Sequence, residues 1–137
     1  MFGKVLVFIA LVMLLFTGCG KDGSYVPDTY VNYQITVQEF NIKKASNGVL
    51  LVPNVGVAGI MIVQSGSGYV AFDRCSSVHP ENLCKVAPDD TGITATDPCT
   101  GAKWLLLDGS PQKAPAVKNL KEYSVSVQGG STIQISN

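Results

Sequence analysis

The sequence lacks the residue patterns on which common enzyme sites depend. Its 137 residues include a single histidine, and charged residues make up only 15% of the chain. No GxSxG nucleophile elbow, glycine-rich phosphate loop or HExxH metal motif occurs in it. The usual sequence marks of a hydrolase or a nucleotide-dependent enzyme are therefore absent, and we expect a protein that is not an enzyme.

The sequence also has little concentrated positive charge. Ten basic and ten acidic residues give a formal net charge of zero, and the lysines are scattered along the chain. There is no basic stripe with interleaved aromatic residues, as nucleic-acid binding requires, and no polybasic patch for lipid headgroups. We therefore expect no nucleic-acid partner.

A long apolar run occurs only at the N-terminus. Val5–Phe16 is an unbroken apolar stretch of 12 residues that follows Lys4. A membrane-spanning helix needs roughly 20 apolar residues, whereas a secretory signal peptide needs a shorter apolar region after a positive charge. The small residues Thr17 and Gly18 then precede Cys19. Residues 1–18 are therefore predicted to be a signal peptide.

The residues Leu15–Cys19 resemble a lipobox, in which the cysteine receives a lipid such as palmitate and becomes the first residue of a bacterial lipoprotein. Phe16 fits this motif less well than leucine would. The alternative is an ordinary secretory signal with an incidental cysteine. We expect an anchor to the membrane of the bacterial cell envelope through Cys19, and Gly20 rather than aspartate favours the outer membrane by resemblance to Gram-negative lipoproteins.

The chain after the signal peptide has the length of one domain. Residues 19–29 are predicted to form the lipidated N-terminus and a tether rich in Gly, Ser and Asp, and residues 30–137 a single β-domain. Removal of Lys4 leaves nine basic residues against ten acidic ones, a formal charge of −1.

The periodicity of this domain is that of β-strands. Apolar Val31, Tyr33, Ile35 and Val37 alternate with polar residues, which predicts a half-buried strand. Two glycines between two alternating segments predict a final β-hairpin over residues 123–135. We expect an all-β fold with little helix beyond a turn near Ala116–Glu122. Four further apolar runs are predicted strands: Val49–Val52, Gly59–Val63, Tyr69–Phe72 and Trp104–Leu107.

Three segments together resemble the Rieske iron–sulfur domain. The resemblance implies a small sandwich of stacked antiparallel sheets with two loops at one end. Gly59–Val63 and Tyr69–Cys75 are similar to the strands that lead into the first cluster-binding loop. Pro98–Gly101, with Lys103 and Trp104, is similar to the second loop. The family's C-terminal segment is matched by Asp108–Ser110, Ala114–Ala116, Leu120, Tyr123 and Val125.

A Rieske centre uses two Cys and two His ligands, supplied as CxH and CxxH pairs. By resemblance the four positions here are Cys75, Ser77, Asp97 and Thr100, so three of the four ligands are lost. The register of Cys75 is open, because family members often place one more residue before the ligand cysteine. Hydroxyl and carboxylate oxygens replace thiolates and imidazoles poorly. We therefore expect no metal and no cofactor; the alternative is an atypical [2Fe–2S] cluster.

The resemblance also implies a disulfide between the two loops, with Cys84–Cys99 as the expected pair and Cys75–Cys99 as the second possibility. The remaining thiol, Cys75, is then a buried small side chain or a redox contact. His79 is expected at the surface, Asp89 and Asp90 in a turn, and Trp104 in the core.

Two functions from different classes remain. The first is a non-catalytic envelope lipoprotein that retains the β-scaffold as a structural or binding module, with an unknown envelope protein as a possible partner. The second is an electron-transfer protein with an atypical cluster. A weaker third possibility is a small-molecule or peptide binder that uses the space between the two loops.

Overall fold

The computed structural model describes residues 25–137 of the chain. The predicted signal peptide and Cys19 lie outside these residues. Within the described part, no helix is long and apolar enough to cross a membrane.

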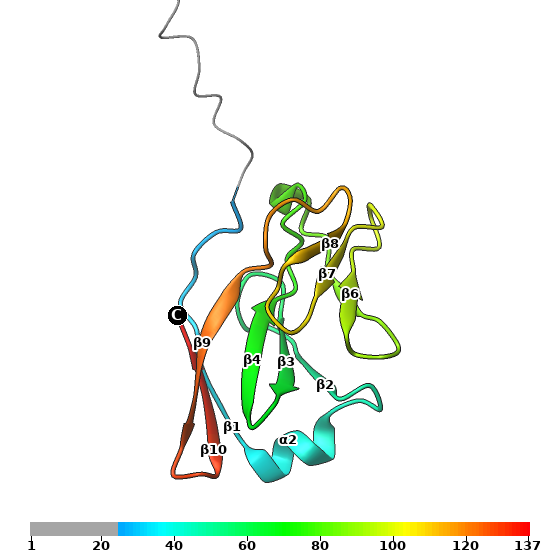
Figure 1. Ribbon diagram of the computed structural model, residues 1–137. Helices are drawn as coiled ribbons and strands as arrows, with labels where there is room; N and C mark the ends of the chain where they lie inside the picture. The colour runs from blue at the N-terminus through cyan, green and yellow to red at the C-terminus, as the bar shows by residue number, and fades with distance from the viewer. Residues whose placement is uncertain (1–24) are drawn as a thin grey trace, which may run out of the picture.

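The larger of two antiparallel sheets contains six strands in the order β1-β10-β9-β4-β3-β2. Figure 1 shows the β9–β10 hairpin beside β1, and the β3–β4 hairpin beside β9. The strands are β1 (Asn32–Thr36), β2 (Val49–Val52), β3 (Ile60–Ser65), β4 (Gly68–Asp73), β9 (Glu122–Gln128) and β10 (Thr132–Ser136).

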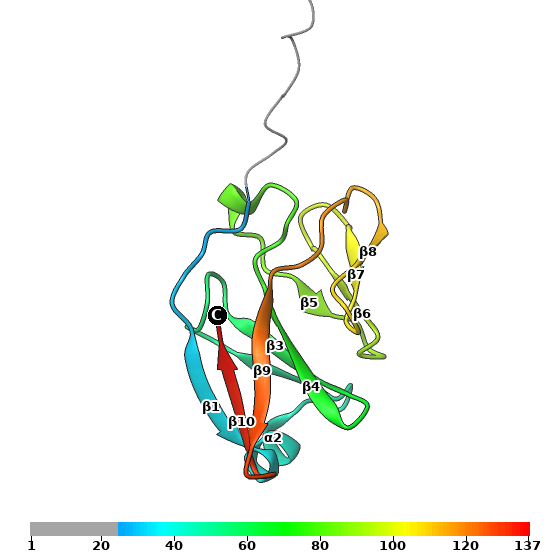
Figure 2. The same ribbon diagram turned by 60° about the vertical axis from the view of Figure 1, so that its left-hand side comes forward.

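The smaller sheet contains four short strands in the order β5-β6-β7-β8 and covers one face of the β2–β4 region. It lies to one side of the six-stranded sheet in Figure 2. Its strands are β5 (Ala87–Pro88), β6 (Thr94–Thr96), β7 (Lys103–Leu105) and β8 (Pro111–Lys113). The sequence analysis did not predict β5, β6 or β8, because two or three residues are too few to establish an alternating pattern.

Two apolar cores arise because side chains alternate across β3. Ile60 and Ile62 point into the core enclosed by the six-stranded sheet and its helix, whereas Met61 points toward the smaller sheet and contributes to a core with Phe72 and Trp104. All five side chains are buried. The two layers of a sandwich are thereby held together, and the prediction of an all-β, Rieske-like sandwich is confirmed.

One helix, α2 (Val37–Lys43), corrects the predicted first strand. The strand ends at Thr36, whose side-chain oxygen accepts a hydrogen bond of 3.0 Å from the backbone N–H of Glu39. This Thr-x-x-Glu arrangement is a helix-capping signature that the alternation ending at Val37 concealed. Phe40 then anchors the helix in the core.

The C-terminal hairpin follows the predicted pairing, with Val127 opposite Ile133 and Val125 opposite Ile135. The helical turn predicted near Ala116–Glu122 was wrong. That segment is irregular, and Glu122 already begins β9. The indole N–H of Trp104 donates to the carbonyl of Lys118 there at 2.9 Å, so a side chain satisfies a backbone group that a helix would pair internally.

Candidate functional site

Two loops meet at one end of the sandwich, at the top in Figures 1 and 2. The first loop, residues 74–86, follows β4; the second, residues 97–102, joins β6 to β7. A disulfide links Cys84 in the first loop to Cys99 in the second, with a Cα–Cα distance of 6.3 Å. This is the pair that the resemblance implied. Closure of a loop of this length contributes about 3 kcal/mol to the free energy of unfolding.

The carboxylate of Asp97 forms a second, polar link between the loops. Its Oδ2 accepts hydrogen bonds from the hydroxyls of Ser76, at 2.7 Å, and Thr100, at 2.9 Å. Its Oδ1 accepts a hydrogen bond of 2.8 Å from the backbone N–H of Cys99. Asp97 and Ser76 are fully buried. These contacts, called here the Asp97 network, fill the space where the loops meet.

The two positions that the resemblance gave in the first loop, Cys75 and Ser77, do not contact Asp97. Ser76, rather than Cys75 or Ser77, faces Asp97, and the sequence analysis missed it. The Ser77 hydroxyl instead donates to the carbonyl of Lys118 at 2.9 Å. The cause lies in the backbone: Cys75 N–H donates to Asp73 Oδ1, and Ser76 N–H to the carbonyl of Cys84. These backbone contacts turn Ser76 toward the second loop.

Cys75 is a buried free thiol. Its Sγ lies 3.6 Å from the carbonyl oxygen of Pro80 and 3.8 Å from that of Ser76. Burial, and secondarily the charges of Asp73 and Glu81, raises the pKa of this thiol to about 11. At neutral pH the thiol is therefore almost entirely protonated, and it is a poor nucleophile.

These residues do not fit a Rieske cluster. The chain's one histidine, His79, lies at the surface, as expected. Its side chain is 69% exposed, and its Nδ1 lies 3.3 Å from a carboxylate oxygen of Glu81. Among the described residues, the one group of potential metal ligands is Cys84, Asp97 and Cys99. Both sulfurs are consumed by the disulfide, and the carboxylate is engaged in the Asp97 network. The donor set therefore contains neither the thiolates nor the imidazoles that a cluster requires.

A second buried carboxylate, Asp73, fixes the start of the first loop. It accepts hydrogen bonds from the backbone N–H groups of Val57, Ala58 and Cys75, at 2.6 to 3.1 Å. The Tyr123 hydroxyl completes the set at 2.7 Å. Burial, followed by this hydrogen bond to the carboxylate, raises the pKa of Tyr123 well above its usual range. The tyrosine is therefore a permanent donor to the carboxylate.

Asp89 lies in the predicted turn, where its carbonyl accepts a hydrogen bond from Gly92 N–H. The turn interpretation is incomplete, because the Asp89 carboxylate also binds Thr94, Thr96 and the Lys103 ammonium at 2.6 to 2.7 Å. Partial burial alone would raise its pKa, but these hydrogen bonds and the charge of Lys103 outweigh burial and lower the pKa. Asp89 thus ties together strands β6 and β7.

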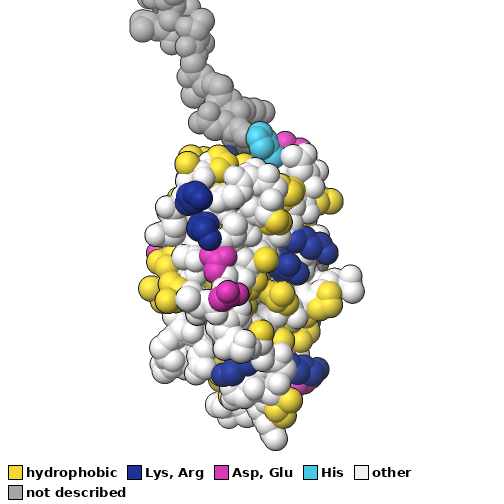
Figure 3. Space-filling model, turned by 90° about the vertical axis from the view of Figure 1, so that its right-hand side faces the viewer, with side chains coloured by type: hydrophobic (Ala, Val, Ile, Leu, Met, Phe, Trp, Pro, Cys, Tyr) yellow, Lys and Arg dark blue, Asp and Glu magenta, His cyan; other side chains and the backbone are white. Residues whose placement is uncertain are grey.

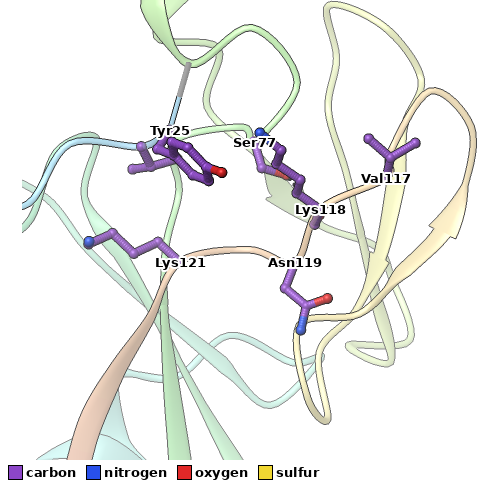
Figure 4. Close-up of a pocket in the computed structure, with 7 residues that line it drawn as sticks. Tyr25, Ser77, Val117, Lys118, Asn119 and Lys121 are labelled. Carbon is purple, nitrogen blue, oxygen red and sulfur yellow. Dashed lines mark hydrogen bonds between the residues drawn. The ribbon is translucent and has the colours of Figure 1, made fainter. Parts of the chain in front are cut away.

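A shallow groove of about 490 Å³ lies beside the two loops. Figure 4 shows Tyr25 and Ser77 on one side of it and Val117 on the other, with Lys118 and Asn119 between them. The ammonium of Lys118 lies 4.1 Å from the centre of the Tyr25 ring. Figure 3 shows charged side chains of both signs scattered over one face of the molecule, without a basic stripe.

Comparison with known proteins identifies the fold. No protein-family model and no curated protein matches the sequence. Among solved structures, the plasma membrane Rieske protein PetC3 of the cyanobacterium Synechocystis is similar with a TM-score of 0.55 and 22% identity, covering 80% of this chain and 99% of that one.

Two further structures have a similar fold. The complex of reduced oxygenase and oxidized ferredoxin in carbazole 1,9a-dioxygenase matches with a TM-score of 0.54 and 17% identity, over 79% of this chain and 94% of that chain. The ferredoxin of carbazole 1,9a-dioxygenase from Nocardioides aromaticivorans matches with a TM-score of 0.51 and 19% identity, over 79% and 97%. At these identities the likeness establishes the fold alone: the described domain is a Rieske-like β-domain.

Proposed function

We propose that this chain is a lipid-anchored protein of the bacterial cell envelope whose Rieske-like domain holds no iron–sulfur cluster and serves as a non-catalytic structural or binding module. One observation carries the proposal. By resemblance Asp97 takes a cluster-ligand position, and its carboxylate accepts hydrogen bonds from Ser76, Thr100 and the backbone of Cys99. The Asp97 network and the Cys84–Cys99 disulfide both join the two loops.

The energetics favour this arrangement over a cluster. Insertion of iron would break at least the contacts of Asp97 to Ser76 and Thr100, and each buried polar group left without a partner costs roughly 1–3 kcal/mol. The hydroxyls and the carboxylate would give little in return, because iron–sulfur clusters are held by soft thiolates and by imidazoles. The buried polar groups where the loops meet therefore have hydrogen-bond partners without a metal.

The lipid anchor is the part of the proposal that rests on residues 1–19. Its test is metabolic labelling with radioactive palmitate in the native host or a related Gram-negative cell, with Cys19→Ser as the matched control. We expect label in the wild-type chain, no label in the variant, and release of the variant from the membrane fraction. Equal labelling of both chains, or no labelling of either, would contradict lipidation at Cys19.

The alternative function is electron transfer through an atypical [2Fe–2S] cluster. The similar solved structures support it, because they are a Rieske protein and the ferredoxins of carbazole 1,9a-dioxygenases. Iron content separates the two: the module function predicts none, whereas the electron-transfer function predicts about two irons per chain.

A further inference from the structure

The loop end of the domain exposes apolar side chains that no described residue covers. Tyr25 is 75% exposed, Leu83 56% and Val117 80%. Tyr25 and Val117 line the same groove, and Leu83 precedes the cysteine that bridges the two loops. Exposed apolar side chains also occur elsewhere on the domain, so their position decides whether this end is a docking surface.

The same end is where the described chain starts. Tyr25 follows Cys19 by six residues, and a fully extended chain spans at most about 3.6 Å per residue, which gives roughly 20 Å between them. The ion pair of Asp28 with Lys121 and the contact of Tyr25 with Lys118 hold residues 25–28 against the domain. A lipid on Cys19 would therefore hold the loop end closer to the bilayer than the opposite end of the sandwich.

We infer that the loop end of the domain rests on the phospholipid surface, with Tyr25, Leu83 and Val117 in the headgroup region. This inference rests on the proposed lipid anchor at Cys19. The chemistry suits such a surface: tyrosine has an apolar ring with a polar tip, which is favoured at membrane interfaces. Lys118 and Lys121 line the same groove, where the Lys118 ammonium contacts the Tyr25 ring and Lys121 pairs with Asp28. Their alkyl stems suit an interface between apolar and polar surroundings.

Position, rather than exposed apolar area alone, distinguishes this surface from others on the domain. Ile42 on α2 is 74% exposed, which is similar to Val117. Helix α2 lies at the end of the molecule opposite the two loops in both Figure 1 and Figure 2. Ile42 is thus a matched control: it is also an exposed aliphatic side chain, but it lies at the end of the domain far from the tether.

The experiment is tryptophan quenching by lipid. The full-length lipidated protein, carrying Val117→Trp or Ile42→Trp, is reconstituted into phosphatidylethanolamine–phosphatidylglycerol vesicles with brominated acyl chains. Both variants share the background of Trp104, which is fully buried and is measured in the wild-type chain. We expect Val117→Trp to lose emission and to shift to the blue, and Ile42→Trp to behave as it does in non-brominated vesicles. Leu83→Trp is a second probe of the same end.

Flotation of the vesicles separates the two claims. If the wild-type chain does not float, the lipid anchor itself is refuted, and the inference fails with it. If the chain floats but the probes at positions 117 and 83 stay unquenched, or the probe at position 42 is quenched as strongly as they are, the anchor stands and the proposed orientation is wrong. Quenching confined to positions 117 and 83 supports the orientation.

Discussion

The hydroxyl of Ser76 donates a 2.7 Å hydrogen bond to the carboxylate of Asp97, and this contact joins the two loops of the domain inside the protein. Both residues are fully buried, and 21 positions separate them in the sequence. Together with the Cys84–Cys99 disulfide, the contact holds the end of the sandwich where a Rieske domain would bind its cluster. The first prediction concerns this pair.

Replacement of Asp97 by alanine should destabilise the fold strongly. The substitution leaves the buried Ser76 hydroxyl without its acceptor, at roughly 1–3 kcal/mol, and also removes the acceptor of the Cys99 N–H, which lies in a more exposed part of the second loop. Ser76→Ala should cost less, and the double variant less than the sum of the two, because the shared contact is lost only once. Urea unfolding measures these differences.

The matched control is Ser124→Ala, a serine on the exposed side of β9. We expect a change within about 0.5 kcal/mol there, as is usual for surface sites. Additive losses at Ser76 and Asp97 would show that the two side chains do not interact.

Gly56 should tolerate no side chain. A Cβ at this position would lie 2.4 Å from Asp73 Oδ2 and 2.9 Å from the Tyr123 hydroxyl, so it would break the network that starts the first loop. Gly66→Ala is the matched control, because Gly66 also has positive φ but nothing lies within 4 Å of the added atom. Thermal unfolding should show a far larger loss for Gly56→Ala. Equal losses would mean that backbone strain alone determines the effect.

The Cys75 thiol should resist alkylation in the folded protein. With a pKa of about 11, about 0.1% of the thiol is ionised at pH 8, and the side chain is also buried. Iodoacetamide with mass-spectrometric detection should label Cys75 slowly in buffer and rapidly in urea. Fast labelling of the native protein would contradict the inert, structural role and would revive the redox interpretation of this thiol.

Asp89 should make stability depend on acid pH. Its pKa is lowered in the fold, so its contribution is fully present above the unfolded value near 3.8 and is lost as the pH falls through the lower native value. Because Asp89 and Lys103 are partly exposed, the contribution is about 1 kcal/mol or less. The difference in unfolding free energy between the wild-type chain and Asp89→Asn should shrink between pH 6 and pH 2; a difference independent of pH would contradict it.

Alternation predicted the C-terminal hairpin, where the burial of β10 alternates, and short apolar runs predicted the inner strands. Val49–Val52 matches β2 residue for residue, and the pairs Val127–Ile133 and Val125–Ile135 form as the two-glycine turn predicts. The pattern failed at Val37, where alternation continues in sequence but the Thr36 cap begins a helix. Local capping chemistry outweighed a fourth alternating residue.

The site was predictable only as far as family spacing reaches. The resemblance pointed to Asp97 and Thr100 in the second loop, and the structure joins the two side chains by a hydrogen bond. In the first loop the orientation of Ser76 depends on hydrogen bonds from the backbone N–H groups of Cys75 and Ser76 to the Asp73 carboxylate and the Cys84 carbonyl. No periodic pattern reports such contacts, so Ser76 could be identified only from the structure.

The most direct test of the central claim is iron and acid-labile sulfide analysis with a visible absorption spectrum. The domain from Gly20 onward is produced anaerobically in cells that assemble iron–sulfur clusters, beside a genuine Rieske protein as positive control. The account predicts a folded, colourless protein free of iron and sulfide, while the control is red-brown. About two irons and two sulfides per chain would contradict the account and make electron transfer the function of this domain.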